Sequence, residues 1–287
     1  MEKEIIINST NEDTRIALLE AGKLVELWVE RPDNERMVGD IYKGRVRKVV
    51  KGMQAAFIDI GFEQDGFLHF ADMGSNVNQL FADIDEELLE GNGKSADVDP
   101  ADLLKNGQEI TVQIIKEPIS NKGPKVTTEI TVPGRFLVLV PNQHRVGISR
   151  KIANVKERKR LRQVARKFLP KNFGLIIRTV AEGKPEDILR QDFQKLMKEW
   201  QRLEKKIQTV KAPALLYQDL GMASSVIRDL FAPDVKRVVV DSRKMYREIT
   251  NYLKDVNSEL LARVSYHKDR RPIFDEYGIE EEIRRSL

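Results

Sequence analysis

Cysteine is absent from this chain of 287 residues, so disulfides, thiolate zinc sites and cysteine nucleophiles are excluded within it. Histidine occurs only three times, at scattered positions, which does not favour a zinc site. The sequence also lacks an uncharged apolar run of about 18 residues, and its start has no apolar core of the kind found in a secretory signal. We therefore expect a globular, cytoplasmic protein without a membrane span.

Charge is nearly balanced overall but strongly segregated along the chain. The formal net charge is +4, yet the stretch from Gln143 to Arg178 contains twelve basic residues and one acid, Glu157. The stretch from Asp72 to Glu109 is the reverse, with ten acids and two lysines. Such segregation draws a polyanion to one face and repels it from another. A single basic run also suits a solvated helix, so this run alone leaves both interpretations open.

Short β-rich runs with glycine turns dominate the sequence after residue 36. The runs cover residues 40–50, 53–60, 67–70, 109–116 and 126–132. Five short strands without a substantial helix predict a small closed barrel of the OB type. The long interruption, residues 74–105, is polar and acidic and contains Gly91-Asn92-Gly93, so it predicts a partly disordered loop with room for one short helix.

The other segments predict helices packed on sheets. Residues 4–8 and 24–30 are β-rich and indicate an opening antiparallel pair. Further on, strands at 135–140 and 173–179 flank a basic helix at about 153–169, and an amphipathic helix follows over 185–209. The tail alternates, with strands expected at 214–218, 237–241 and 262–267 and helices through 226–231 and over 242–262. This order is typical of α/β layering.

The barrel region contains aromatic and basic side chains that suit single-stranded RNA. The aromatic candidates are Tyr42, Phe57, Phe67, His69 and Phe70, and the interleaved cations are Lys43, Arg45, Arg47 and Lys48. Unstacked bases lie flat on exposed rings while nearby cations hold the phosphates. A phenylalanine in a strand is more often buried than exposed. The period of two in Lys43, Arg45 and Arg47 puts these cations on one strand face, and this row is the stronger indication of RNA.

Six motifs follow one another along nearly the whole chain. They are Gly39-Asp-Ile-Tyr-Lys-Gly44, Ala55-Ala-Phe-Ile-Asp59, Asn121-Lys-Gly-Pro-Lys-Val-Thr-Thr128, Pro133-Gly-Arg-Phe-Leu-Val-Leu-Val-Pro141, Gly147-Ile-Ser-Arg150 and Gly174-Leu-Ile-Ile-Arg-Thr179. The segments from Ile41 to Val46 and from Ala55 to Gly61, with Asp65-Gly-Phe-Leu-His69, resemble the RNA-binding barrel of ribosomal protein S-one. In this order and spacing, the full set resembles the ribonuclease E/G family of bacterial endoribonucleases.

The resemblance implies two groups of RNA-binding residues. Phe57 and Phe67, with Lys122 of the Asn-Lys-Gly turn, would form the RNA-contact surface of the barrel, to which we add Lys43 and Arg45 from the cation row. The pocket that senses a 5′-monophosphate on the RNA end would comprise Gly134, Val138, Arg150, Arg178 and Thr179. A guanidinium fork and a hydroxyl suit phosphate oxygens, and a glycine lets the backbone approach closely.

The architecture that the resemblance implies is α+β and multidomain. Residues 36–132 would form the OB-fold barrel with the acidic insertion 72–105, and residues 133–212 a small α/β domain that senses the 5′ phosphate. Both would be inserted into a ribonuclease-H-like α/β subdomain made of residues 1–35 and 213–287. In this family, that subdomain is a structural support.

The family cleaves single-stranded RNA with Mg²⁺ in RNA processing and decay. The chain ends near where the family's nuclease domain should begin, so we expect it to bind RNA that carries a 5′-monophosphate without cutting it, and we assign no catalytic residue, metal ligand or cofactor. Asp255-Val-Asn257 resembles the catalytic Asp-x-Asn triplet but lies upstream of the expected place. Two alternatives stay open: a stand-alone RNA-binding module, and a nuclease using ribonuclease-H-like carboxylates such as Asp13, Asp59, Asp219 and Asp241. Self-association into a homo-oligomer also stays open.

Overall fold

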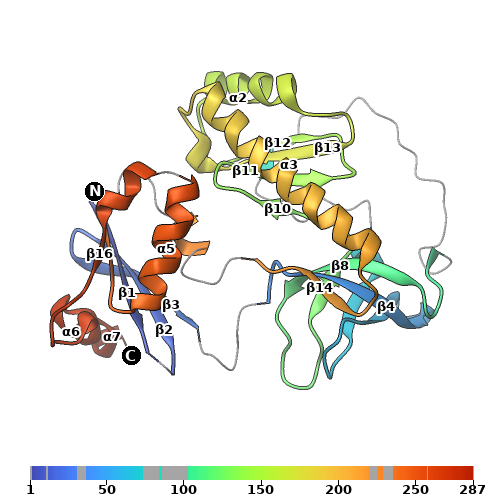
Figure 1. The fold of residues 1–287 in the computed structure, drawn as a ribbon, viewed down its shortest axis with the longest axis horizontal. Helices are drawn as coiled ribbons and strands as arrows, with labels where there is room; N and C mark the ends of the chain where they lie inside the picture. The colour runs from blue at the N-terminus through green and yellow to red at the C-terminus, as the bar shows by residue number, and fades with distance from the viewer. Residues whose placement is uncertain are drawn as a thin grey trace. The chain divides into compact units, whose positions relative to one another are not determined.

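A computed structural model describes residues 2–10, 12–30, 37–73, 84–85, 103–219, 225–228, 235–256 and 258–286. The chain divides into two compact units, Met1–Arg36 with Leu220–Leu287 and Met37–Asp219 (Figure 1). Most of the predicted acidic insertion 72–105 lies outside the described residues, as do the end of the helix predicted through 226–231 and Asn257 of the Asp-x-Asn triplet.

The first unit is built on a five-stranded sheet of order β16-β15-β1-β2-β3. Its strands are β1 (Lys3–Ser9), β2 (Thr14–Glu20), β3 (Lys23–Glu30), β15 (Val235–Val240) and β16 (Val264–Tyr266). β1, β2 and β3 pair antiparallel, whereas β15 pairs parallel with β1, and β16 parallel with β15. The predicted direct pairing of 4–8 with 24–30 is wrong, because β2 lies between them. The Ala, Leu and Glu residues of β2 have a low intrinsic preference for strands, so the sequence did not indicate a strand there. In the folded sheet, pairing with β1 and β3 outweighs this low preference.

Helices cover both faces of this sheet. The elements are α5 (Arg243–Val256), η6 (Ser258–Arg263), α6 (Ile273–Glu276) and α7 (Ile279–Ser286). Ile5 and Ile7 of β1 pack in one buried cluster with residues of α5, whereas Ile6 packs in another with residues of α6 and α7. A run of three buried isoleucines is typical of a strand that is covered on both sides.

The second unit contains the predicted barrel. Its strands are β4 (Ile41–Val50), β5 (Ala55–Asp59), β6 (Gly66–His69), β8 (Glu109–Lys116) and β9 (Lys125–Thr127). The ladder runs β4-β5-β6-β9-β8 and closes through β8 onto β4, so the prediction of five short strands in a closed barrel is confirmed. The short turns η2 (Lys51–Met53) and η3 (Phe70–Asp72) follow β4 and β6. Alternate residues such as Val46, Ile58 and Leu68 fill the interior.

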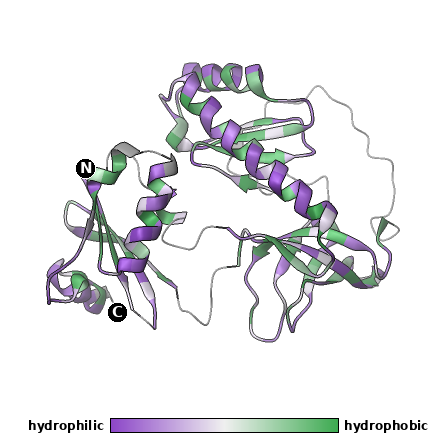
Figure 2. Ribbon diagram, viewed as in Figure 1, coloured by the Kyte–Doolittle hydropathy of each residue, from purple (hydrophilic) through white to green (hydrophobic). Residues whose placement is uncertain are grey.

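The same unit contains a second sheet, of order β10-β11-β13-β12-β7. Its elements are β7 (Ile84–Asp85), β10 (Val132–Pro133), β11 (Leu137–Pro141), β12 (Val146–Ser149), β13 (Phe173–Ile177), η5 (Thr179–Ala181), α2 (Val155–Phe168) and α3 (Glu186–Thr209). Leu139 and Leu175 of this sheet pack with Leu161 of α2 and Leu196 of α3 in one buried cluster. In Figure 2, hydrophilic and hydrophobic residues alternate along both helices, as expected for helices with one buried face.

α3 joins this second sheet to the barrel. Trp200 and Leu203 of α3 share their buried cluster with Ile41 of β4 and Leu216 of β14 (Ala214–Tyr217). β14 pairs antiparallel with β4, and Asp219 N–H donates to Asp40 Oδ1 at 2.8 Å. Residues 213–219, assigned from the sequence to the outer subdomain, therefore belong with the barrel, because β4 offers β14 a strand edge.

No helix among the described residues is long and apolar enough to cross a bilayer.

Candidate nucleic-acid interface

A row of aromatic side chains lies on the outer face of the barrel. Phe57 of β5 and Phe67 of β6 pair directly across the strands, and their ring centroids lie 5.9 Å apart in an edge-to-face arrangement. Their strand neighbours Ala56 and Leu68 point inward, so alternation points both rings outward, where they are half-buried. The half-buried ring of His69 lies 6.5 Å from that of Phe67. Phe57, Phe67 and His69 are called the aromatic row below.

The turn that carries Lys122 adjoins this row. Phe67 N–H donates to Pro124 O at 2.8 Å, and Phe67 is in register with Lys125. A side chain at Gly123 would begin 1.9 Å from the carbonyl oxygen of Asp65, so glycine is what lets the turn approach β6. Lys122 is exposed on that turn. The fold thus pairs Phe57 with Phe67 and places the turn that carries Lys122 beside the strand of Phe67.

Two other aromatic candidates belong to the core. Tyr42 and Phe70 are buried inside the barrel cluster, which corrects their interpretation as exposed rings. Burial raises the pKa of Tyr42 to about 12. Phe62, in the turn after β5, is 43% exposed and meets Tyr42 edge-to-face at 5.5 Å. The exposure of Phe62 could not be predicted from the sequence, because a turn residue has no strand partner that indicates its face.

The structure corrects the prediction that Lys43 contacts RNA. Its Nζ donates to Ile207 O at 2.9 Å and Val210 O at 2.8 Å, at the end of α3, and lies 2.9 Å from Glu109 Oε2. Its side chain is only 13% exposed. The hydrogen bond from Lys43, followed by one from Ala212 N–H, lowers the pKa of Glu109. Lys43 therefore serves to hold α3 against β4.

The other two cations of the row are also paired with protein groups. Arg45 Nη2 donates to Ala212 O at 3.1 Å and lies 3.6 Å from Glu109 Oε1, while its side chain stays 48% exposed. Arg47 lies 3.2 Å from both Asp59 Oδ2 and Asp65 Oδ1. Period two does place the three cations on one face, but carboxylates from other strands neutralise that face. Of these residues, only Arg45 and Arg47 keep enough exposure to approach a phosphate.

The predicted phosphate-sensing residues gather at one end of the second sheet. Arg178 follows β13, and its Nη1 donates to Gly134 O at 2.9 Å, in the turn between β10 and β11. Thr179 is exposed, and its hydroxyl shares a hydrogen bond of 2.9 Å with Ser149 Oγ, at the end of β12. These two neighbours are thus bonded to the strands on either side of β13. Ser149 was not among the predicted site residues, although it lies in the Gly147–Arg150 motif.

Val138 and Arg150 complete this group. Val138 pairs with Ile176, two residues before Arg178, and both side chains are absent from the cluster under α2 and α3. Arg150 is exposed in the turn directly after Ser149. The residues Gly134, Val138, Ser149, Arg150, Arg178 and Thr179 are called the β13-end cluster below.

Asp192 of α3 fixes the turn that carries Gly134. Its carboxylate accepts backbone hydrogen bonds from Phe136 at 2.9 Å, Leu137 at 3.0 Å and Arg135 at 3.3 Å. Burial raises the pKa of Asp192, and these three donors oppose that effect. A side chain on Gly134 would begin 2.8 Å from Asp192 Oδ2. The signal in the sequence is the spacing of Asp192 from Leu189 and Leu196, which places a carboxylate on the apolar face of the helix.

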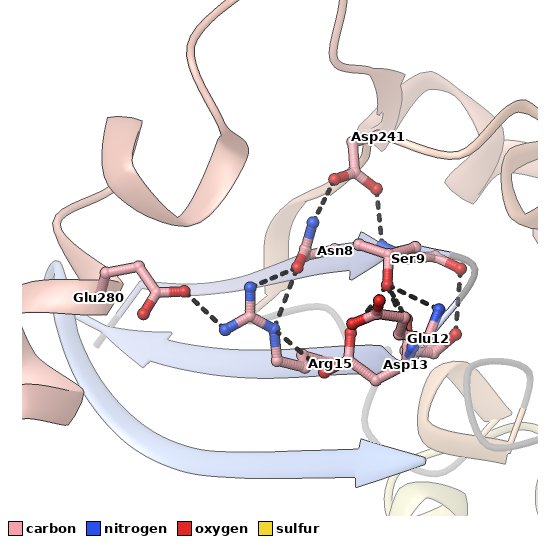
Figure 3. A network of polar contacts seen from close by, with 9 residues as sticks. Asn8, Ser9, Glu12, Asp13, Arg15, Asp241 and Glu280 are labelled. Carbon is pink, nitrogen blue, oxygen red and sulfur yellow. Dashed lines mark hydrogen bonds and ion pairs between the residues drawn. The ribbon is translucent and has the colours of Figure 1, made fainter. Parts of the chain in front are cut away.

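The four carboxylates of the alternative nuclease site are divided between the two units. Asp59 and Asp219 belong to the second unit, and Asp13 and Asp241 to the first. Asp241 accepts hydrogen bonds from Asn8 Nδ2 at 2.6 Å and from Ser9 N–H at 2.8 Å, and Arg15 bridges Asn8 and Glu280 (Figure 3). Both Asp241 oxygens therefore accept hydrogen bonds from within the protein.

One group of described residues has the composition of a metal site, namely His267, Asp269 and Glu276 in the first unit. His267 Nε2 hydrogen bonds with Arg271 O at 2.8 Å, and Nδ1 lies 3.8 Å from Glu276 Oε2. Mg²⁺ takes oxygen ligands in octahedral geometry, so a set containing an imidazole does not fit it.

Comparisons with known proteins agree with the motif order. The sequence profile of the Ribonuclease E/G family matches residues 131–287, and that of the S1 RNA binding domain matches residues 35–128. The chain is 34% identical over 287 residues to ribonuclease G of Escherichia coli strain K12, and the match covers all of this chain and 57% of that protein. It is 36% identical over 285 residues to ribonuclease G of Haemophilus influenzae, covering 99% and 56%. Ribonuclease E of a Nostoc species is 36% identical over 292 residues, covering 100% and 40%.

Proposed function

This chain belongs to the ribonuclease E/G family, and we propose that it is the part of a single-strand endoribonuclease that binds RNA and senses its 5′-monophosphate. The family resemblance and the S1-type RNA-binding barrel predicted from the sequence are confirmed. The chain spans 56–57% of the length of the ribonuclease G proteins that it matches. For the whole protein, we therefore propose Mg²⁺-dependent cleavage of single-stranded RNA, a role in RNA processing and decay, and a cytoplasmic location.

The observation that carries this proposal is the meeting of Arg178, Thr179, Gly134 and Ser149 at the end of β13. A terminal phosphate has more charge and more acceptor oxygens than a terminal hydroxyl, so a guanidinium with neighbouring hydroxyls distinguishes the two. Arg178 is held from one side by Gly134 O, and the Thr179 hydroxyl from the other by Ser149 Oγ. Both groups are thus fixed before RNA arrives, which lowers the ordering cost of binding.

The barrel would supply the grip on the strand itself. Two half-buried rings beside the exposed Lys122 suit bases that stack and a phosphate that follows them. Stacking tolerates any base, so this surface would bind without strong sequence preference.

The first unit would serve as structural support. Its strand order, with three antiparallel strands followed by two parallel ones, supports the proposal of a ribonuclease-H-like subdomain. The bonded state of Asp241 supports the view that this subdomain does not cut RNA itself.

The test is the binding of fluorescent single-stranded RNAs that differ only in a 5′-monophosphate or a 5′-hydroxyl, with cleavage followed in Mg²⁺. We expect the wild-type chain to prefer the phosphate by about tenfold or more, since a hydrogen bond to a charged group contributes about 1.5–3 kcal/mol. Arg178→Ala should abolish the preference. Thr179→Val, which keeps the shape of an exposed side chain, should reduce it. Arg202→Ala on α3, where the side chain is 74% exposed, is the matched control.

Other results would favour the alternatives. Equal binding of both RNA ends by the wild-type chain would indicate a general RNA-binding module. Cleavage by this chain that Asp241→Asn abolishes would indicate a nuclease in the first unit. Sedimentation of the purified chain tests self-association, which stays part of the proposal.

A further inference from the structure

A row of exposed cations runs along the outer face of α2. Lys156, Lys159 and Arg166 are exposed and lie three and seven residues apart, a spacing that places them on one face of a helix. Leu161, Val164 and Ala165 lie on the opposite face and are buried. We call Lys156, Lys159 and Arg166 the α2 stripe.

Other basic residues of α2 are used within the protein. Arg158 Nη1 donates to Ser149 O at 2.9 Å and Ile152 O at 3.2 Å. Arg160 donates to Glu157 at 2.7 and 2.6 Å and to Lys184 O at 2.8 Å. Lys167 lies 2.6 Å from Glu186 Oε2. The internal and the outward cations are therefore different residues of the same helix.

No acid neutralises the stripe from within its own segment. Glu157 is the one acid between Gln143 and Arg178 in the sequence, and Arg160 already binds both of its oxygens. The exposed Arg150 and Lys151 lie in the turn just before α2. Positive charge thus extends from the β13-end cluster along the outer face of the helix, which makes a field that attracts a polyanion.

We propose that the α2 stripe binds the phosphate backbone of the RNA whose 5′ end lies at the β13-end cluster. This inference rests on the proposed function, because it takes RNA as the ligand of the neighbouring cluster. From Lys156 to Arg166 the helix rises by about 15 Å, enough to contact several successive phosphates. The stripe offers bases nothing to stack on, since Phe168 packs on Phe193 with ring centroids 5.0 Å apart. Recognition is therefore of charge, independent of sequence.

RNA fits the stripe better than a lipid surface does. A helix that binds an anionic membrane inserts its apolar face among the lipids. The apolar face of α2 is buried against the sheet, and Val155 is its one large apolar side chain that is strongly exposed, at 77%. A row of cations without an apolar face to insert can bind an anionic partner by electrostatic attraction alone. This attraction is strongest for closely spaced phosphates such as those of an RNA backbone.

The test measures the salt dependence of RNA binding by the full chain. The probes are single strands of about 4 and about 20 nucleotides, each with either a 5′-monophosphate or a 5′-hydroxyl, and only the longer strand offers many phosphates beyond its 5′ end. We expect the variant Lys156→Gln, Lys159→Gln, Arg166→Gln to lower the slope of log K against log salt by about 2 for the long RNA, since each phosphate contact in a single strand contributes about 0.7. The preference for a 5′-monophosphate on the short RNA should persist.

The matched control is Lys198→Gln, Arg202→Gln, Lys205→Gln on α3, which removes the same charge from exposed positions that Glu199 and Glu204 accompany. An unchanged slope in the α2 variant, or an equal fall in the control, would overturn the inference. Binding of phosphatidylglycerol vesicles that depends on the stripe, with an unchanged RNA slope, would assign the stripe to lipid. If the wild-type chain bound RNAs with a 5′-monophosphate and a 5′-hydroxyl equally well, that result would instead contradict the proposed function.

Discussion

The cations of β4 and those of α2 look alike in the sequence but have different surroundings in the structure. Lys43, Arg45 and Arg47 each lie near a carboxylate that another strand or turn supplies. The α2 stripe lies outward in a segment whose single acid is bound elsewhere. Spacing decides which face a cation occupies, whereas the electrostatic field of that face depends on residues far away along the chain. A cation row is a nucleic-acid surface only where that distant charge is missing.

Lys43→Met should have the largest effect on stability. An unchanged stability would contradict the view that the β4 cations bind groups within the protein. The substitution leaves Ile207 O and Val210 O without this donor at the end of α3 and removes one of the partners of Glu109. We expect the free energy of unfolding to fall by about 2–3 kcal/mol, as measured by urea denaturation. The salt slope of RNA binding should not change.

Lys48→Met is the control for this prediction, because Lys48 is exposed on the same strand. It should change the free energy of unfolding by less than about 0.5 kcal/mol. If Lys43→Met left stability intact and lowered the salt slope by about 0.7, then Lys43 would contact RNA and would not serve to hold α3 against β4.

Phe67→Leu tests whether the aromatic row binds RNA by stacking, in contrast to the α2 stripe, which would bind it by charge. The barrel face has rings with neutralised cations, whereas the stripe has cations without rings. Loss of a stacking ring should weaken binding of the long RNA by about 1–2 kcal/mol, roughly tenfold, with the salt slope unchanged. Phe62→Leu, at a more exposed ring outside the aromatic row, should bind as the wild type does. Equal losses in both variants would show that the row is not a distinct site.

Much of the fold could be predicted from local patterns, because turns and apolar spacing are local. Glycine turns and alternation identified the barrel strands, and the apolar spacing of Phe193, Leu196 and Trp200 identified α3. The pairing of β14 with β4 could not be predicted, since it depends on a strand edge that only the folded barrel offers.

The site residues divide in the same way. Motif order indicated Arg178 and Thr179, which lie at the β13 end together with Gly134. Nothing near Lys43 in the sequence indicates that its ammonium binds carbonyls more than 160 positions away. Asp192 was detectable in principle, because an acid on the apolar face of a helix needs buried donors.

Glu157→Gln should have the smallest effect and tests the comparison by creating an uncompensated cation. Glu157 accepts hydrogen bonds from Arg160 and, at 2.9 Å, from Gly183 N–H. Its loss should cost about 1 kcal/mol of stability at neutral pH. The hydrogen bond from Arg160, together with that from Gly183 N–H, lowers the pKa of Glu157 in the folded chain. The stabilising contribution is therefore complete at neutral pH, and it is lost as the pH falls below the ordinary carboxyl range and through the folded pKa.

Urea denaturation at several pH values checks this sign, because the difference between wild type and Glu157→Gln should shrink toward acid pH. Glu182→Gln, at an exposed position beside Gly183, should show no such difference. Freed from its carboxylate, Arg160 keeps its bond to Lys184 O but adds a net charge beside the stripe. The salt slope for the long RNA should then rise by up to about 0.7, the contribution of one phosphate. A slope that falls instead would mean that the neutralised and exposed cations of α2 do not act as separate sets.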